Sequence, residues 1–159
     1  MTRLGWIAAA LTLTACGGAE PSAPREPLAA AQGVAVLDGY VRPAARGAAA
    51  TAGYLTIRSD REDALVAASS PGFAATELHE ATEADGVSRM RRVDAVPLPA
   101  GETVVLAPGG LHLMMMGPES ALSEGDSLPV TLTFESGAAV TLGLPVQRRG
   151  PGGTDHAGH

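Results

Sequence analysis

The chain has 159 residues, a formal net charge of −6, eleven Arg with no Lys, and a single Cys at position 16. This length suffices for one domain with its own hydrophobic core. Apolar residues make up 45 % and charged residues 18 %, a balance typical of globular chains. The negative charge argues against nucleic acid as a partner, because its binding needs a basic patch. A single Cys excludes an internal disulfide.

Residues 1–15 are predicted to be an export signal. Arg3 provides a positive start, and the apolar run of residues 4–13 is too short to span a bilayer. The run ends in Leu13-Thr14-Ala15-Cys16, which resembles the bacterial lipobox, whose Cys becomes the lipid-bearing first residue. The alternative is an ordinary signal peptide that leaves Cys16 as a free thiol. We therefore expect a lipoprotein in the bacterial cell envelope, anchored to a membrane through acyl chains and facing the periplasm.

The rest of the chain divides into a tether, one domain and a tail. Residues 16–32 are rich in Ala, Pro, Gly and Ser without periodicity, which predicts a flexible tether. The domain is expected over residues 33–147. Residues 148–159 are expected to form a disordered tail, because they contain few apolar residues and many Pro and Gly.

The predicted domain consists of short apolar stretches separated by turn residues. Asp85-Gly86 and Ser136-Gly137 are typical of hairpin turns. Many short strands with frequent turns predict an all-β sandwich, and only residues 120–124 could form a helical turn. The expected strands cover residues 34–41, 52–59, 64–69, 75–81, 87–93, 103–107, 111–116, 127–135 and 138–146.

Four residues of this domain are candidate metal ligands: His79, Met90, His112 and Met114. In a strand, residues two apart point to the same face, so His112 and Met114 should present their donors together. His79 and Met90 lie on the two arms of the hairpin around Asp85-Gly86 and are expected to be cross-strand neighbours. Thioether sulfur is a poor ligand for calcium, magnesium or zinc and a good one for Cu(I), and imidazole suits copper. The set therefore favours Cu(I).

The spacing of these four residues resembles a known family motif. Ten residues separate His79 from Met90, twenty-one separate Met90 from His112, and one separates His112 from Met114. This is similar to the His-x10-Met-x21-His-x-Met motif of PCuAC-type periplasmic copper chaperones. The resemblance covers roughly residues 34–146. It implies a Greek-key, cupredoxin-like β-sandwich with a copper site at its rim.

The resemblance also implies a function. It indicates an exported Cu(I) chaperone rather than an enzyme, with the copper-accepting subunit of a cytochrome oxidase as client and a Sco-type thiol protein as collaborator. Two alternatives stay open: a periplasmic copper buffer or scavenger, and a structural β-sandwich lipoprotein without a metal role. A blue-copper electron carrier is excluded, because it needs a Cys ligand and Cys16 lies at the export signal.

Several further residues are weaker candidates. Met115 and Met116 are interpreted mainly as core residues, with a role as auxiliary metal ligands as the alternative. In the tail, His156 and His159 could bind Cu(II) loosely through nitrogen, as His-rich tails do in some members of the family.

Two glutamates flank the first candidate ligand. Glu77 and Glu80 are interpreted as solvated charges on a strand. The alternative is that one of them accepts a hydrogen bond from His79 and orients its imidazole.

Overall fold

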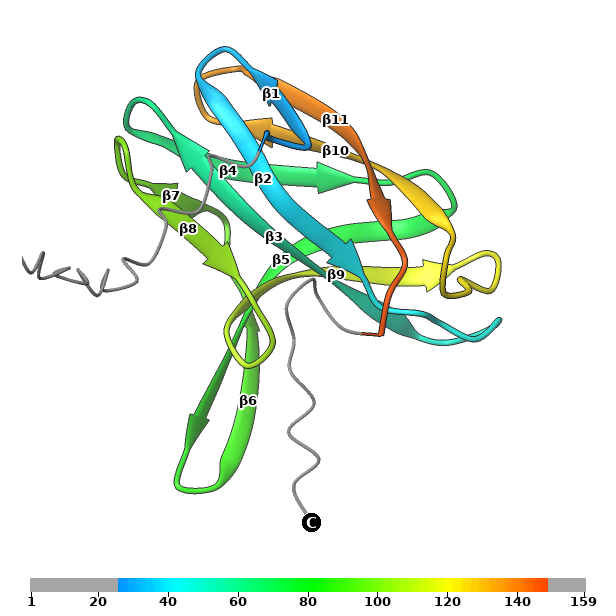
Figure 1. Cartoon of the computed structure of the whole chain (residues 1–159). Helices are drawn as coiled ribbons and strands as arrows, with labels where there is room; N and C mark the ends of the chain where they lie inside the picture. The colour runs from blue at the N-terminus through cyan, green and yellow to red at the C-terminus, as the bar shows by residue number, and fades with distance from the viewer. Residues whose placement is uncertain (1–25, 149–159) are drawn as a thin grey trace, which may run out of the picture.

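The structure, a computed structural model, describes residues 26–148. These residues form two antiparallel β-sheets packed face to face (Figure 1). None of them belongs to a helix that is long and apolar enough to cross a membrane. The strands are β1 (Ala29–Ala31), β2 (Val34–Val41), β3 (Ala50–Ser59), β4 (Asp63–Ser69), β5 (Phe73–Ala84), β6 (Val87–Arg92), β7 (Val96–Leu98), β8 (Thr103–Leu106), β9 (Leu111–Pro118), β10 (Ser127–Phe134) and β11 (Ala139–Pro145).

The chain crosses repeatedly between the two sheets. The larger sheet has seven strands in the order β1-β2-β3-β9-β5-β6, with β8 also paired to β3. The smaller sheet has the order β11-β10-β4-β7. Because β4 lies in the smaller sheet and β3 and β5 in the larger one, β9 can pair between β3 and β5. This topology confirms the predicted all-β, Greek-key, cupredoxin-like sandwich.

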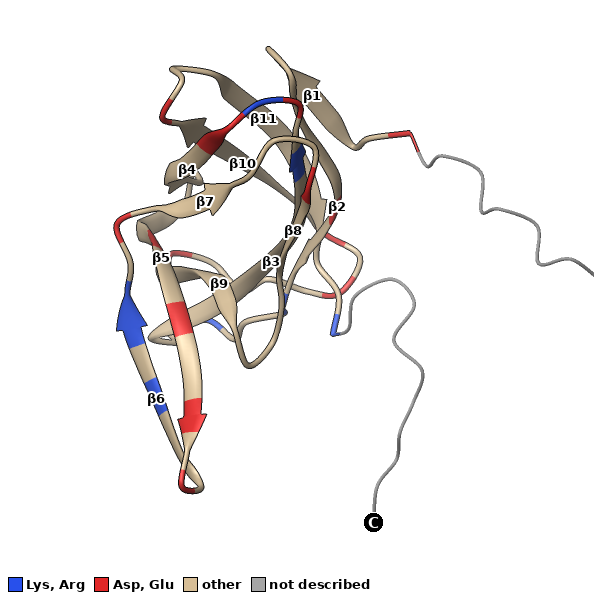
Figure 2. Ribbon diagram, turned by 90° about the vertical axis from the view of Figure 1, so that its left-hand side faces the viewer, with Lys and Arg blue, Asp and Glu red and all other residues tan. Residues whose placement is uncertain are grey.

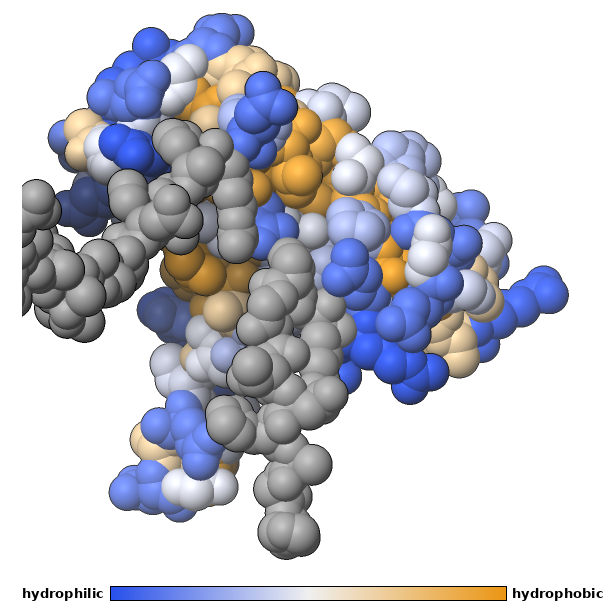
Figure 3. Space-filling model, viewed as in Figure 1, coloured by the Kyte–Doolittle hydropathy of each residue, from blue (hydrophilic) through white to orange (hydrophobic). Residues whose placement is uncertain are grey.

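The hydrophobic core fills the space between the sheets. Alternate residues of β10 and β11 are buried, as their sequence pattern predicts. Figure 3 shows polar side chains over the projecting ends of the molecule and apolar ones mainly within the body of the sandwich. With few aromatic residues available, the fully buried side chains are mostly Val, Leu and Ile; the largest is Phe134, followed by Leu55, Ile57, Leu65, Leu98, Leu106, Leu113, Met115, Leu132 and Leu144.

A buried carboxylate links the turn of the β10–β11 hairpin to β4. Asp63 is 7 % exposed and accepts hydrogen bonds from the backbone N–H of Ala64 and from both the N–H and the hydroxyl of Ser136. Burial by itself raises the pKa of Asp63, but these hydrogen bonds and the nearby charge of Arg61 outweigh it and hold the pKa below its usual value. Asp63 is therefore ionised near neutral pH and stabilises the turn.

The nine predicted strands are all present, with ends that differ by a few residues. Two short strands were not predicted, β1 and β7. The expected tether over residues 16–32 is therefore wrong at its C-terminal end, because Ala29–Ala31 forms a strand that pairs with β2. The turn between the two strands is Gln32-Gly33, with φ angles of 50° and 86°. A run of alanines carries no strand periodicity, so the pairing has no local signal. The suggested helical turn at residues 120–124 is also wrong; Leu122 forms a β-bridge with Ala44.

The β5–β6 hairpin projects from the sandwich as an arm (Figure 1). Its two-residue turn is Asp85-Gly86, with φ angles of 55° and 73°, so the predicted hairpin is confirmed. Every residue of β6 is exposed. Figure 2 shows basic positions, in blue, along β6 beside acidic positions, in red, along β5. This arm carries Met90.

Candidate metal centre

Strand β9 separates core residues from candidate ligands by simple alternation. Leu113 and Met115 are fully buried and belong to the core between the sheets. His112 and Met114 point to the opposite, outer face of the larger sheet, where His112 is only 5 % exposed and Met114 is half-buried. The predicted facing of this strand is therefore correct.

Strand β5 brings a second imidazole to the same face. His79 lies directly opposite His112 in the register of β5 and β9, and their ring centroids are 6.0 Å apart. Glu77 lies directly opposite Met114. The four side chains thus occupy neighbouring positions on two paired strands. Sequence reasoning did not anticipate the pairing of His79 with His112, because it depends on two strands that are far apart in the chain.

Met90 lies on the same face, but its position differs from the predicted one. The direct partner of His79 across the hairpin is Arg92, whereas Met90 pairs with Ala81. The reason is the two-residue turn at Asp85-Gly86, which fixes the register of the arm. Met90 is therefore a diagonal neighbour of His79, a relation in which Cα atoms are about 7–8 Å apart. Its side chain is 52 % exposed.

Each imidazole has one nitrogen that is committed to a hydrogen bond and one that is not. The Nδ1–H of His112 donates to the carbonyl oxygen of Gly110 at 2.9 Å, which leaves the lone pair on Nε2. The Nε2–H of His79 donates to Oε2 of Glu77, also at 2.9 Å. Nδ1 of His79 is buried and has no hydrogen-bond partner among residues 26–148. Buried nitrogens are normally paired, so an unpaired Nδ1 at this position fits the role of a metal ligand.

The Glu77 carboxylate is ionised, and each of its two oxygens has a hydrogen-bond partner. Its hydrogen bond with His79 lowers the pKa of Glu77, against the effect of burial, and the charge of Arg92 lowers it further. Arg92 Nη1 lies 3.0 Å from Oε1 of Glu77. The interpretation of Glu77 as a solvated charge is therefore wrong, because its side chain is only 21 % exposed and both oxygens have partners. Glu80, which pairs with Arg91, does not touch His79.

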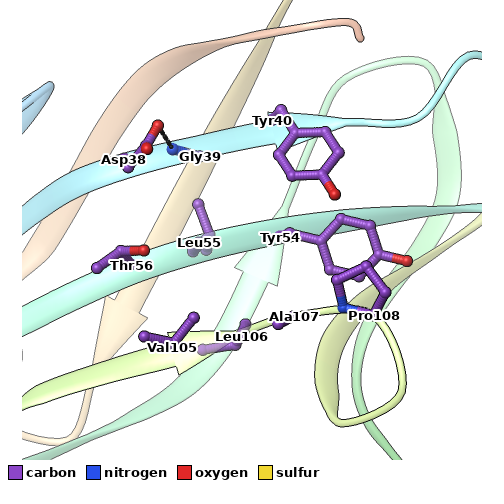
Figure 4. Close-up of a pocket in the computed structure, with 10 residues that line it drawn as sticks. All are labelled: Asp38, Gly39, Tyr40, Tyr54, Leu55, Thr56, Val105, Leu106, Ala107 and Pro108. Carbon is purple, nitrogen blue, oxygen red and sulfur yellow. Dashed lines mark hydrogen bonds between the residues drawn. The ribbon is translucent and has the colours of Figure 1, made fainter. Parts of the chain in front are cut away.

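Two tyrosines flank the His112 side of the site. The Tyr54 ring centroid is 6.5 Å from that of His112 and 5.0 Å from that of Tyr40. Both tyrosines line a pocket of about 140 Å³, in which Figure 4 shows the ring of Tyr54 beside Pro108. Sequence reasoning did not single out these residues. The ring of Tyr54 lies next to His112, and Tyr40 packs against the ring of Tyr54.

The main interpretation of Met115 as a core residue is confirmed, because its side chain is fully buried between the two sheets. Its alternative role as an auxiliary metal ligand is therefore wrong. Met116 is half-buried on the site face, opposite Ala75. His156, His159 and Cys16 lie outside the described residues.

The candidate metal donors on this face include thioether sulfur as well as imidazole nitrogen. Within residues 26–148, no three His, Cys, Asp or Glu side chains are grouped so that they could hold a metal ion. Met114, two residues from His112, and Met90, diagonal to His79 across the hairpin, place thioether sulfur on the same face as the two imidazoles. Such a set suits a soft, monovalent ion.

Comparisons with known proteins agree with this fold. The family model described as "LpqE-like: Putative lipoprotein LpqE-like" matches residues 34–146. "Putative lipoprotein Lxx21020" from Leifsonia xyli subsp. xyli is 33 % identical over 138 residues, which cover 86 % of this chain and 83 % of that protein.

Two solved structures are similar over most of the domain. The copper-bound PCuAC domain from PmoF2 has a TM-score of 0.62 and 24 % identity, covers 76 % of this chain and 97 % of its own, and shows the fold alone. The solution structure of the Cu(I) form of DR1885 from Deinococcus radiodurans has a TM-score of 0.58 and 27 % identity, and covers 70 % of this chain and 76 % of its own.

Proposed function

Because this chain belongs to the LpqE-like family, which is of the PCuAC type, we propose that it is an exported Cu(I) chaperone. The observation that carries the proposal is the direct pairing of His79 with His112, beside the thioether of Met114. Each imidazole keeps one ring nitrogen whose lone pair is available to a metal ion. The Cu(I) form of DR1885 shares this fold and supports copper as the cargo.

The proposed donors suit an ion that must be given away. Two imidazoles and two thioethers are neutral and soft, so they favour Cu(I) over Cu(II), which prefers more nitrogen or oxygen. Met90 stands on the projecting arm and is 52 % exposed, whereas His112 is almost buried. An acceptor protein can therefore approach the ion from the Met90 side and replace this thioether first.

A competition titration tests the copper site. Cu(I) is titrated, under reducing conditions, into a mixture of a chromophoric chelator and the chain without its predicted signal peptide. We expect one tight equivalent in the parent, its loss in the double variant His112→Ala, Met114→Ala, and its retention in the tail control His156→Ala, His159→Ala. A parent that does not compete for Cu(I) would favour the structural lipoprotein instead.

A transfer experiment separates a chaperone from a buffer. By resemblance, the proposed client is the copper centre of a cytochrome oxidase subunit, with a Sco-type thiol protein as collaborator. We expect the Cu(I)-loaded chain to transfer its ion to the purified metal-free copper domain of that subunit, as measured by the metal content of the separated proteins. Copper that stays with the chain when the acceptor is in excess would favour the buffer.

The proposed location is the periplasmic side of the cell envelope, with Cys16 lipidated. The description of the family and of the Leifsonia relative as lipoproteins supports this location. We expect Cys16→Ser to lose a metabolically incorporated acyl label and to leave the membrane fraction. A variant that keeps the label would contradict the lipobox interpretation.

A further inference from the structure

We propose that Glu77 is a positioning residue for the metal site. It holds the His79 imidazole with the proton on Nε2, so that Nδ1 is the nitrogen left to donate to copper. The inference rests on the proposed copper function, but the orientation it assigns is a property of the metal-free chain.

The first argument is the geometry of the pair. Glu77 and His79 are two residues apart on β5, so their side chains leave the same face side by side. Glu77 Oε2 is 2.9 Å from His79 Nε2, and the two side chains are only 21 % and 16 % exposed. A carboxylate accepts hydrogen bonds only, so His79 must be the donor. Because a neutral imidazole has one N–H, Nδ1 of His79 then carries the lone pair, and this is the buried nitrogen without a partner.

The second argument is that the carboxylate is itself oriented. Its other oxygen, Oε1, is 3.0 Å from Nη1 of Arg92. Arg92 lies directly opposite His79 on β6, two residues from Met90. Glu77 therefore joins the imidazole to the strand that carries the exposed thioether.

The third argument concerns charge. The four proposed ligands are neutral, so they do not compensate the charge of Cu(I). Glu77 places a negative charge one hydrogen bond from the imidazole of His79 and also lies directly opposite Met114. Hydrogen bonding of a ligating His to a carboxylate raises the basicity of the ligand, and loss of such a partner typically weakens metal binding by about 10-fold to 100-fold.

The chain contains a matched control at Glu80. Glu80 is also on β5 and also pairs with an arginine of β6, Arg91. It points to the opposite face of the arm, because it is three residues from Glu77, and it does not contact His79. Substitution of Glu80 removes the same charge and the same kind of ion pair, but it leaves the imidazole untouched.

The experiment compares Glu77→Ala, Glu77→Gln and Glu80→Ala in the chain without its signal peptide. Nitrogen-15 NMR of the histidine rings, recorded where their signals no longer change with pH, gives the tautomer of His79 in the metal-free protein. We expect Nε2–H in the parent and in Glu80→Ala, and a mixture of tautomers in Glu77→Ala. Glu77→Gln is similar in size to the parent residue and provides an amide acceptor, so we expect it to fold and to retain Nε2–H.

Cu(I) competition completes the test. We expect the dissociation constant of Glu77→Ala to rise about 10-fold to 100-fold, that of Glu77→Gln to rise less, and that of Glu80→Ala to stay unchanged. A parent with the proton on Nδ1 of His79, or a Glu77→Ala variant with parental affinity, would overturn the proposal. If the parent bound no Cu(I), the copper function would fail, while the NMR result would still decide the orientation of His79.

Discussion

Substitution of Met115 by alanine should lower the stability of the fold, whereas substitution of its neighbour Met114 should lower the affinity for Cu(I). Met115 is fully buried in the core, whereas Met114 is half-buried on the site face. Truncation of a buried Met to Ala costs about 2–5 kcal/mol, because apolar contacts are lost and a cavity remains. At about 4 °C per kcal/mol for a domain of this size, Tm should fall by about 8–20 °C. Met114→Ala removes a side chain outside the core, so it should cost about 1 kcal/mol or less.

The two variants are compared in two assays. Urea unfolding of the metal-free chain, followed by far-ultraviolet circular dichroism, gives the free energy of unfolding. Chelator competition gives the affinity for Cu(I). We expect Met115→Ala to lose stability and keep one tight equivalent of Cu(I) under conditions in which it is folded. We expect Met114→Ala to keep its stability and bind Cu(I) much more weakly.

The reverse pattern would refute the reasoning. If Met115→Ala lost copper binding at unchanged stability, the core side of β9 would be misassigned. If Met114→Ala unfolded without metal, its thioether would be a core group and not a ligand.

Three further predictions test the buried charge, the close packing and the arm. Asp63→Asn should lower the free energy of unfolding by about 1–3 kcal/mol at pH 7. Because the folded pKa of Asp63 is lowered, its stabilisation is complete above the unfolded pKa and is lost as pH falls through the folded value. In urea unfolding the difference should therefore shrink as pH falls below the unfolded pKa and vanish below the folded pKa. Gly39→Ala should lower the free energy of unfolding by about 1–3 kcal/mol in the same assay, because a Cβ there would lie 2.7 Å from Leu55 Cδ2. Gly110→Ala, whose nearest contact would be 3.7 Å, is the control and should cost less. Met90→Leu should weaken Cu(I) binding in chelator competition without changing Tm, since Met90 is 52 % exposed.

Each of these predictions has a clear contrary result. A stability difference for Asp63→Asn that stays constant down to pH 3 would show that the charge of Asp63 is not its source. Equal costs for Gly39→Ala and Gly110→Ala would mean that the strand interior at Gly39 relaxes freely. Unchanged Cu(I) affinity in Met90→Leu would remove the arm from the metal site.

Local pattern identified most strands of this protein and the residue types that are candidates for metal binding. Alternation of apolar residues identifies β10 and β11, and Asp-Gly identifies the turn of the arm, because strand faces and two-residue turns depend on neighbouring residues. The same period of two placed His112 and Met114 on one face and Met115 on the other side of β9. The types and spacing of the four candidate ligands indicated soft-metal chemistry without any coordinates.

Only the tertiary structure decided which side chains meet. His79 faces His112 because β9 enters the larger sheet between β3 and β5, and this register is set by the packing of the whole sandwich. The hydrogen bond from His79 to Glu77 and the ring of Tyr54 beside His112 depend on the same arrangement. No local signal reports such contacts, since their energy comes from strands that are distant in the chain. The sequence therefore names the candidate donors, and the fold decides how each of them is oriented.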